Sequence, residues 1–150
     1  MKILLETIPH YQQVYPTVGD WRVANAIVQQ VDLQPAKPAE GELPPIEKVL
    51  LIRSSQLPDP RMELLVQIHE LVEATLCEHA GVTQEQVDVF DKKFEADRAL
   101  GLHGETDESG DAHDAPYRMQ HGIATSVERL MAALLGVDWN EYDAAINALP

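Results

Sequence analysis

The sequence predicts an α+β fold, in which a small N-terminal antiparallel sheet of two to three strands packs on about four α-helices. Three observations support this class. Short apolar runs rich in β-branched residues occur before residue 55. After residue 60, apolar residues recur with the 3.6-residue period of a helix. The chain has 150 residues, 45% of them hydrophobic, which is enough for one domain over 1–150 with a buried core.

The strands are expected in the first third of the chain. Segment 2–8 is apolar and stops at Pro9, and the Val-Leu-Leu-Ile run within 47–54 is the clearest strand pattern. Segment 21–31 has apolar residues that could line one face of a helix, but its β-branched residues favour a strand. Segment 34–46 contains four prolines and a glycine, which indicates a flexible loop and not a domain boundary.

The central helix is expected from Pro60 to about Ala80. Asp59 can accept hydrogen bonds from the free N–H groups at its start, and Pro60 suits the first turn. Gly81 can end the helix in a left-handed conformation.

Three more helices are predicted from similar boundary signals. A capping-box pattern at 83–86 begins a helix that runs to about Leu100. Asp114 and Pro116 suit the start of a helix that ends before Gly136, and Asp138 suits the start of a short final helix. In the helix that ends before Gly136, we expect an apolar stripe to face the core. It consists of Ile123, Ala124, Val127, Leu130, Met131 and Leu134.

The formal net charge of −14 argues against electrostatic attraction to nucleic acid or to anionic membranes. It is compatible with cation binding or with a solvated acidic surface. Cys77 is the single cysteine, so no intramolecular disulfide can form. No apolar run is long enough to span a bilayer, and the N-terminus turns acidic at Glu6, too early for a signal peptide. We therefore expect a cytoplasmic protein; its oligomeric state cannot be read from the sequence.

The motif His-Glu-x-x-Glu at 69–73 lies in the central helix. Because His69 and Glu73 are one turn apart, both can bind the same metal ion. Glu70 occupies the place where the zinc-peptidase pattern H-E-x-x-H has its general base. The alternative is a surface pair worth about 0.3–0.5 kcal/mol, because His69 and Glu73 lie on the flank of the apolar stripe centred on Ile68.

A second histidine, His121, lies on the flank of the apolar stripe in the later helix, together with Tyr117 and Glu128. If the two helices pack together, His121 joins His69 and Glu73. Such a set provides three zinc ligands and leaves a fourth position for water. The alternative is a half-buried histidine that is hydrogen-bonded to a neighbour.

Asp91 belongs to an acidic face of the second helix, with Asp88 and Glu95. It is a candidate for an additional metal ligand or for a carboxylate that orients a ligand histidine, as are Tyr117 and Glu128. The alternative is a solvated acidic face.

Several short motifs are spread over most of the chain. They are Ile8-Pro9-His10, the segment 15–21, the segment 69–73, Phe90-Asp91, Gly110-Asp111, Ala115-Pro116-Tyr117, His121 and the segment 136–139. In combination, these motifs resemble a group of small proteins encoded by tailed bacteriophages and prophages. The resemblance implies a phage origin and the cytoplasm of a bacterial host, but no particular activity.

The order of a strand followed by the 69–73 helix also resembles the zincin metallopeptidases. This resemblance implies a zincin-like fold, with His69 and Glu73 as zinc ligands, Glu70 as the base that activates water, and His121 as a candidate third ligand. Glu73 departs from the family pattern, which has histidine there. A carboxylate at this position lowers the net charge of the metal site and weakens its Lewis acidity.

These observations lead to three functional hypotheses. The first is a phage-encoded protein that binds zinc, or another divalent metal, and acts as a hydrolase or peptidase. The second is a non-enzymatic acidic protein that binds a host protein. The third is a magnesium-dependent nucleotide pyrophosphatase that uses Glu70, Glu73, Asp88 and Asp91.

Overall fold

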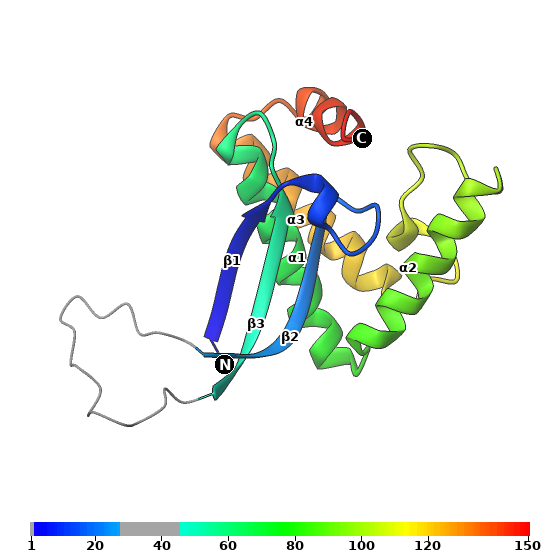
Figure 1. Cartoon of the computed structure of the whole chain (residues 1–150). Helices are drawn as coiled ribbons and strands as arrows, with labels where there is room; N and C mark the ends of the chain where they lie inside the picture. Colours follow the sequence, from blue (N-terminus) through cyan, green and yellow to red (C-terminus); the bar gives the residue numbers. More distant parts are fainter. Residues whose placement is uncertain (1, 28–45) are drawn as a thin grey trace.

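The computed structural model describes residues 2–27 and 46–150 (Figure 1). The loop expected at 34–46 lies outside these residues except for Ile46, and so do residues 28–31 of the expected second strand. No helix in the described part of the chain is both long and apolar enough to cross a membrane.

The sheet has three strands, β1 (Lys2–Ile8), β2 (Gly19–Ile27) and β3 (Ile46–Ser55), in the order β1-β3-β2. The predicted α+β class is confirmed. The prediction of an antiparallel sheet is wrong for one pair: β2 and β3 are antiparallel, but β1 and β3 are parallel. The chain leaves β1 through a short 3₁₀ helix (His10–Gln12) and crosses to the far edge, so β3 returns between the two earlier strands.

The helices are α1 (Pro60–Ala80), α2 (Gln84–Ala99), α3 (Arg118–Leu135) and α4 (Trp139–Asn147). The predicted caps of α1 are present: the Asp59 side chain accepts a hydrogen bond from the Arg61 N–H at 2.8 Å, and Gly81 has φ 74°. The capping box before α2 and the Asp138 cap before α4 are also present.

The start of α3 differs from the prediction. The helix begins at Arg118 and not near Asp114, and a second 3₁₀ helix (Ser109–Asp111) precedes it. Residues 114–117 form turns, and the buried Tyr117 side chain is hydrogen-bonded to Asp91 and to Ser109. These contacts hold the segment against α2, so that the helix begins only afterwards.

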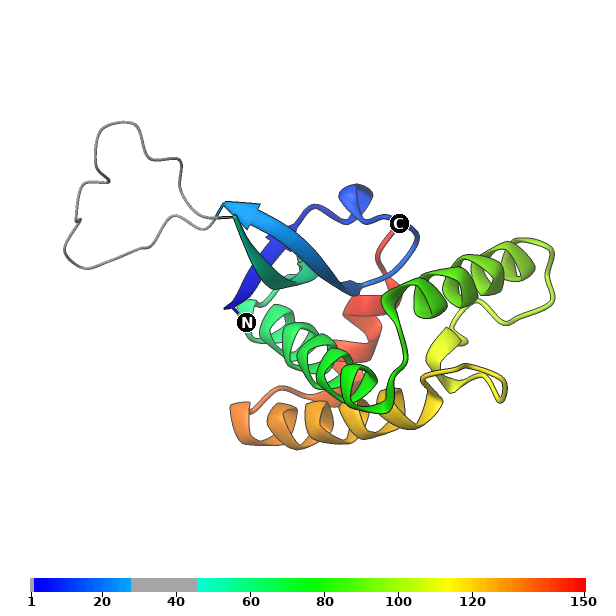
Figure 2. The same cartoon turned by 90° about the horizontal axis from the view of Figure 1, so that it is seen from below.

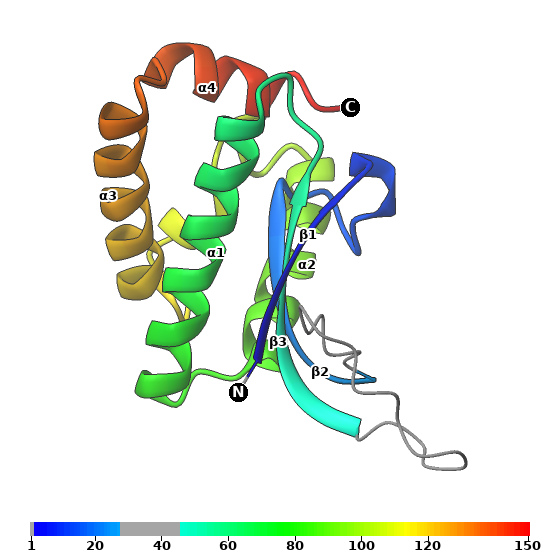
Figure 3. The same ribbon diagram turned by 90° about the vertical axis from the view of Figure 1, so that its left-hand side faces the viewer.

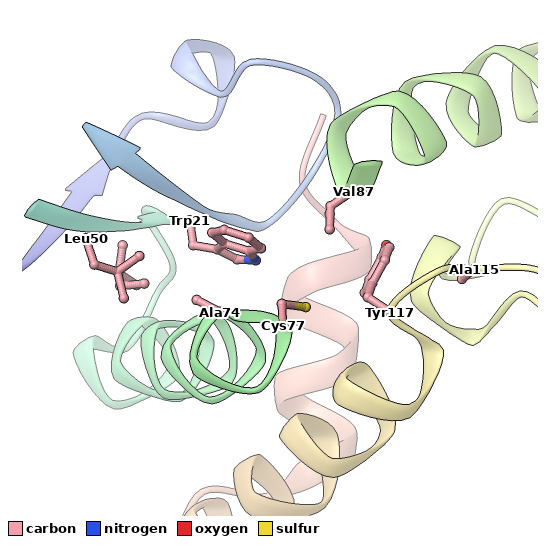
Figure 4. Close-up of a cluster of buried hydrophobic side chains, with 8 residues drawn as sticks. Trp21, Leu50, Ala74, Cys77, Val87, Ala115 and Tyr117 are labelled. Atoms are coloured by element: carbon pink, nitrogen blue, oxygen red, sulfur yellow. The ribbon is translucent and has the colours of Figure 1, made fainter. Parts of the chain in front are cut away.

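The helices lie in layers on one side of the sheet. Figures 2 and 3 show α1 between the sheet and α3, with α2 to one side and α4 across one end. One apolar cluster joins the sheet, α1 and α2; in Figure 4, Trp21 lies between β2 and α1. Its buried members are Trp21, Leu50, Ile52, Ala74, Cys77, Val87, Ala115 and Tyr117. A second cluster lies towards α4 and consists of Met62, Leu65, Val66, Ala132, Val137 and Tyr142.

The expected core stripe of α3 is wrong for three of its large apolar members, which face outwards. Ala124 is buried, and Met131 packs against the second cluster. Ile123, Leu130 and Leu134 are 44%, 60% and 71% exposed. The buried residues of α3 are His121, Ala124, Glu128 and Ala132. Along α1, the buried polar residues His69, Glu70 and Glu73 lie between apolar residues of the second cluster (62, 65 and 66) and of the first (74 and 77). The two clusters therefore enclose a polar layer.

Candidate metal centre

Three side-chain atoms from α1 and α3 converge in this polar layer. Nε2 of His69 lies 3.2 Å from Nδ1 of His121 and 3.5 Å from Oε2 of Glu73. Nδ1 of His121 lies 3.1 Å from the same Glu73 oxygen. All three residues are buried. The structure therefore brings together the three residues that the sequence predicted as metal ligands.

The size of this triangle fits a zinc ion. Two ligand atoms bound at about 2.0–2.1 Å in tetrahedral geometry lie about 3.3–3.4 Å apart. The three observed distances, 3.1, 3.2 and 3.5 Å, bracket that value. Two histidines and one glutamate are also the donor set of known catalytic zinc sites.

The other nitrogen of His69 is held by α3. Nδ1 of His69 lies 2.9 Å from Oε2 of Glu128, and the second Glu128 oxygen accepts a hydrogen bond from the Tyr142 hydroxyl. Because an ionised carboxylate can only accept, this contact places the proton of His69 on Nδ1 and leaves the Nε2 lone pair for a metal. Glu128 thus has the orienting position that the sequence suggested.

His121 has a similar support from the loop before α3. Its Nε2 lies 3.1 Å from Oε2 of Glu108, which is part of a largely exposed side chain. The backbone of Gly110 packs directly on the ring: a Cβ added there would lie 2.3 Å from Cγ of His121. Glu108 and Gly110 therefore fix the ring with Nδ1 towards the triangle.

Glu73 is supported from the sheet. The indole N–H of Trp21 donates to Oε1 of Glu73 at 3.1 Å, which leaves Oε2 for the triangle. Each of the three candidate ligands thus has its remaining polar atom held by another side chain. Partners of this kind orient metal ligands and tune their basicity.

The charges of this layer are strongly coupled. Burial disfavours protonated His69 and His121, but hydrogen bonds with carboxylates outweigh it, raising the pKa of His69 well above its usual range and that of His121 to about 9. Burial acts to raise the pKa of Glu73, but its hydrogen bonds to His121 and His69 lower it to about 2. The layer is therefore arranged to compensate buried negative charge with positive charge.

Glu70 lies beside the triangle with a different environment. Glu70 is buried, with 9% of the residue exposed, and no hydrogen bond joins its side chain to another described residue. Burial raises its pKa well above the usual range, and the nearby charge of Glu73 adds to this effect. Gly19 makes room for it, because a Cβ there would lie 2.7 Å from Oε1 of Glu70.

Asp91 and Tyr117 do not join the triangle. The Asp91 carboxylate accepts hydrogen bonds from the Tyr15 hydroxyl at 2.9 Å and from the Tyr117 hydroxyl. Neither oxygen of Asp91 contacts a described histidine at hydrogen-bonding distance, so it orients no candidate ligand. The Tyr117 ring packs with its edge towards His121, at 6.2 Å between ring centroids. These residues shape the wall next to the site.

A cavity of about 410 Å³ opens onto these residues. It is lined by His69, Glu70, Glu73 and His121, by the tyrosines around Asp91, and by residues of α2 and α4. Its volume is within the range of small-ligand sites in proteins.

The sequence did not indicate Trp21, Glu108 or Tyr142 as site residues. Trp21 and Tyr142 lie on elements distant in sequence from the 69–73 motif, and no local pattern marks them. Glu108 belongs to an acidic loop whose only signal is its composition.

Comparisons with protein-family models, with curated proteins and with solved structures find no match to this chain.

Proposed function

We propose that this protein is a zinc-dependent hydrolase of zincin-like type that cleaves a peptide or another amide. The single observation that carries the proposal is the triangle of His69, Glu73 and His121, in which every ligand has its second polar atom held by a partner. If His69, Glu73 and His121 served only to stabilise the fold, nothing would require the buried Glu70 beside them. Its carboxylate has no hydrogen-bond partner among the described residues, which is costly for a purely structural group.

The motif has Glu73 where the zinc-peptidase pattern has a second histidine, but this difference does not count against a catalytic zinc site. Two histidines and one glutamate give the same donor composition as established catalytic zinc sites. What differs is the order, since the glutamate comes from the motif helix and the second histidine from α3. The Trp21 N–H also withdraws part of the negative charge of Glu73.

The residues divide into three roles. His69, Glu73 and His121 hold the ion, which when bound supplies Lewis acidity and a water of lowered pKa. Glu70 takes a proton from the attacking water and passes it to the leaving amine. Burial raises the pKa of this carboxylate above its usual range, which makes it a stronger base than an exposed glutamate. Glu128 and Glu108 keep the two histidines in orientation.

The resemblance to proteins of tailed phages supports a location in the cytoplasm of a bacterial host. In that setting the substrate is a host or phage protein.

The test uses zinc-loaded wild type and Glu70→Gln with a pool of fluorogenic peptides. We expect both proteins to bind zinc, with hydrolysis lowered about 10²–10⁴-fold in Glu70→Gln. Glu78→Gln, which removes an exposed carboxylate of the same helix, is the control and keeps wild-type activity. Equal hydrolysis by wild type and Glu70→Gln, or no hydrolysis by the zinc-loaded wild type, contradicts the proposal.

A second candidate function, binding of a host protein without catalysis, is favoured by the net charge of −14 and by the exposed apolar side of α3. It predicts salt-sensitive capture of one host protein, with no effect of Glu70→Gln on that capture.

A further inference from the structure

The acidic residues of the chain are concentrated around the cavity. Its 35 described lining residues are under a quarter of the chain, yet they include 11 of the 25 aspartates and glutamates. Of the 11 lysines and arginines, the same lining includes one. The acidity of this cavity therefore exceeds what the overall composition accounts for. Like charges around a concave, low-dielectric site focus the potential and attract ions of opposite sign.

The one arginine of the lining, Arg98, is already engaged. Its guanidinium donates to the backbone carbonyls of Gly104, Glu105 and Asp107 and to the Glu95 carboxylate at 3.1 Å. Among the described lining residues, no lysine or second arginine is present to bind a phosphate or a substrate carboxylate. Apart from the histidines and the proposed ion of the triangle, the described lining therefore offers no free cation to an anionic ligand.

Among the lining carboxylates that are not exposed, two have no hydrogen-bond or ion-pair partner in the described part of the chain. Glu70 is nine-tenths buried and forms no hydrogen bond with a described residue. Asp88, on the α2 wall and partly buried, forms no hydrogen bond or ion pair with a described residue. Its neighbours on the same helix face differ, because Asp91 is held by two tyrosines and Glu95 by Arg98.

We infer that the cavity binds a substrate carrying positive charge, a peptide with a lysine or arginine side chain next to the cleaved amide. Asp88 faces that side chain from α2, while Glu70 serves the reacting amide at the triangle. The inference rests on the proposed hydrolase function, which supplies the amide, but the preference for a cation rests on the charges of the lining alone.

The probes are two blocked tetrapeptides, acetyl-Ala-Lys-Ala-Ala-amide and acetyl-Ala-Glu-Ala-Ala-amide. Because Trp21 and Trp139 both line the cavity, tryptophan fluorescence reports binding without any catalysis. In wild type at low salt, we expect the lysine peptide to bind at least tenfold more tightly than the glutamate peptide. This ratio falls in 0.5 M NaCl, because salt screens charges that lie near solvent.

The variants locate the preference. Asp88→Asn lowers the lysine-to-glutamate affinity ratio at least threefold. Glu78→Gln removes the same charge from an exposed site outside the cavity and changes the ratio by less than twofold. Equal affinity for both peptides in wild type overturns the inference. The inference is also overturned if Asp88→Asn and Glu78→Gln lower the affinity ratio equally, because that result indicates attraction to the acidic surface as a whole.

Metal content separates this inference from the proposed function. Zinc in the protein without a preference for the lysine peptide overturns the cation site alone. If the wild-type protein binds no zinc but still prefers the lysine peptide, the result supports the cation site and contradicts the hydrolase.

Discussion

Glu128→Gln tests whether the partner of His69 tunes a metal site. Glutamine has the shape of glutamate, so its amide oxygen can accept the His69 Nδ1 proton at the observed 2.9 Å while its NH₂ group donates to the Tyr142 oxygen. The substitution thus keeps the packing and removes one charge. Loss of such a carboxylate partner typically weakens metal binding 10–100-fold, or about 1.4–2.7 kcal/mol.

The assay is competition for zinc against a chromophoric chelator, with circular dichroism to establish that each variant is folded. Tyr142→Phe is the matched control: it removes the other hydrogen bond of Glu128 but leaves the full carboxylate charge for His69. We expect its zinc affinity to equal or slightly exceed that of wild type. A Glu128→Gln affinity within threefold of wild type, or equal weakening by Tyr142→Phe, refutes the reasoning.

Three more outcomes are expected. Gly110→Ala places a Cβ 2.5 Å from Nδ1 of His121 and should weaken zinc binding at least tenfold in the chelator assay. Gly122→Ala is the control and should leave zinc affinity unchanged, because no atom lies within 4 Å of its added Cβ. Equal zinc affinities of the two variants contradict the role given to Gly110. In the metal-free protein, the raised pKa values of His69 and His121 mean that the folded state binds more protons than the unfolded state. The stabilisation that the two histidines give the fold is therefore complete below about pH 6.5 and is lost as pH rises through about 9. Urea denaturation in a chelating buffer checks this prediction, and a free energy of unfolding that rises over that pH range contradicts it. Zinc at 1,000 times its Kd adds about 4 kcal/mol to the free energy of unfolding, which corresponds to a Tm increase of about 8–16 °C by calorimetry. An unchanged Tm excludes specific binding of zinc to the native state.

Local signals gave most element boundaries correctly. Asp59, Gly81 and the capping box at 83–86 act within one turn of their own helices, so they can be recognised without knowledge of the fold. The parallel pairing of β1 with β3 could not be recognised, because it depends on a contact between strands more than forty residues apart.

The buried sides of α1 and α3 were harder to predict for a physical reason. A helical wheel assumes that the more apolar side faces the core. Here His69 and Glu73 of α1 meet His121 and Glu128 of α3 between the two helices, where each polar group is satisfied by another. The apolar side of α3 is consequently turned outwards. The spacing of the motif predicted that His69 and Glu73 meet, and the flank position of His121 made it a candidate partner. The burial of all three depended on contacts between the two helices, which no single helix contains.

The most direct test of the account is metal analysis of the untagged protein, covering zinc, iron and manganese, because two histidines and a carboxylate also suit iron(II). His69→Ala and His121→Ala are analysed alongside it. The account predicts about one zinc per chain in wild type and none in either variant. The absence of bound metal from all three proteins after incubation with zinc, or equal metal content in all three, contradicts it.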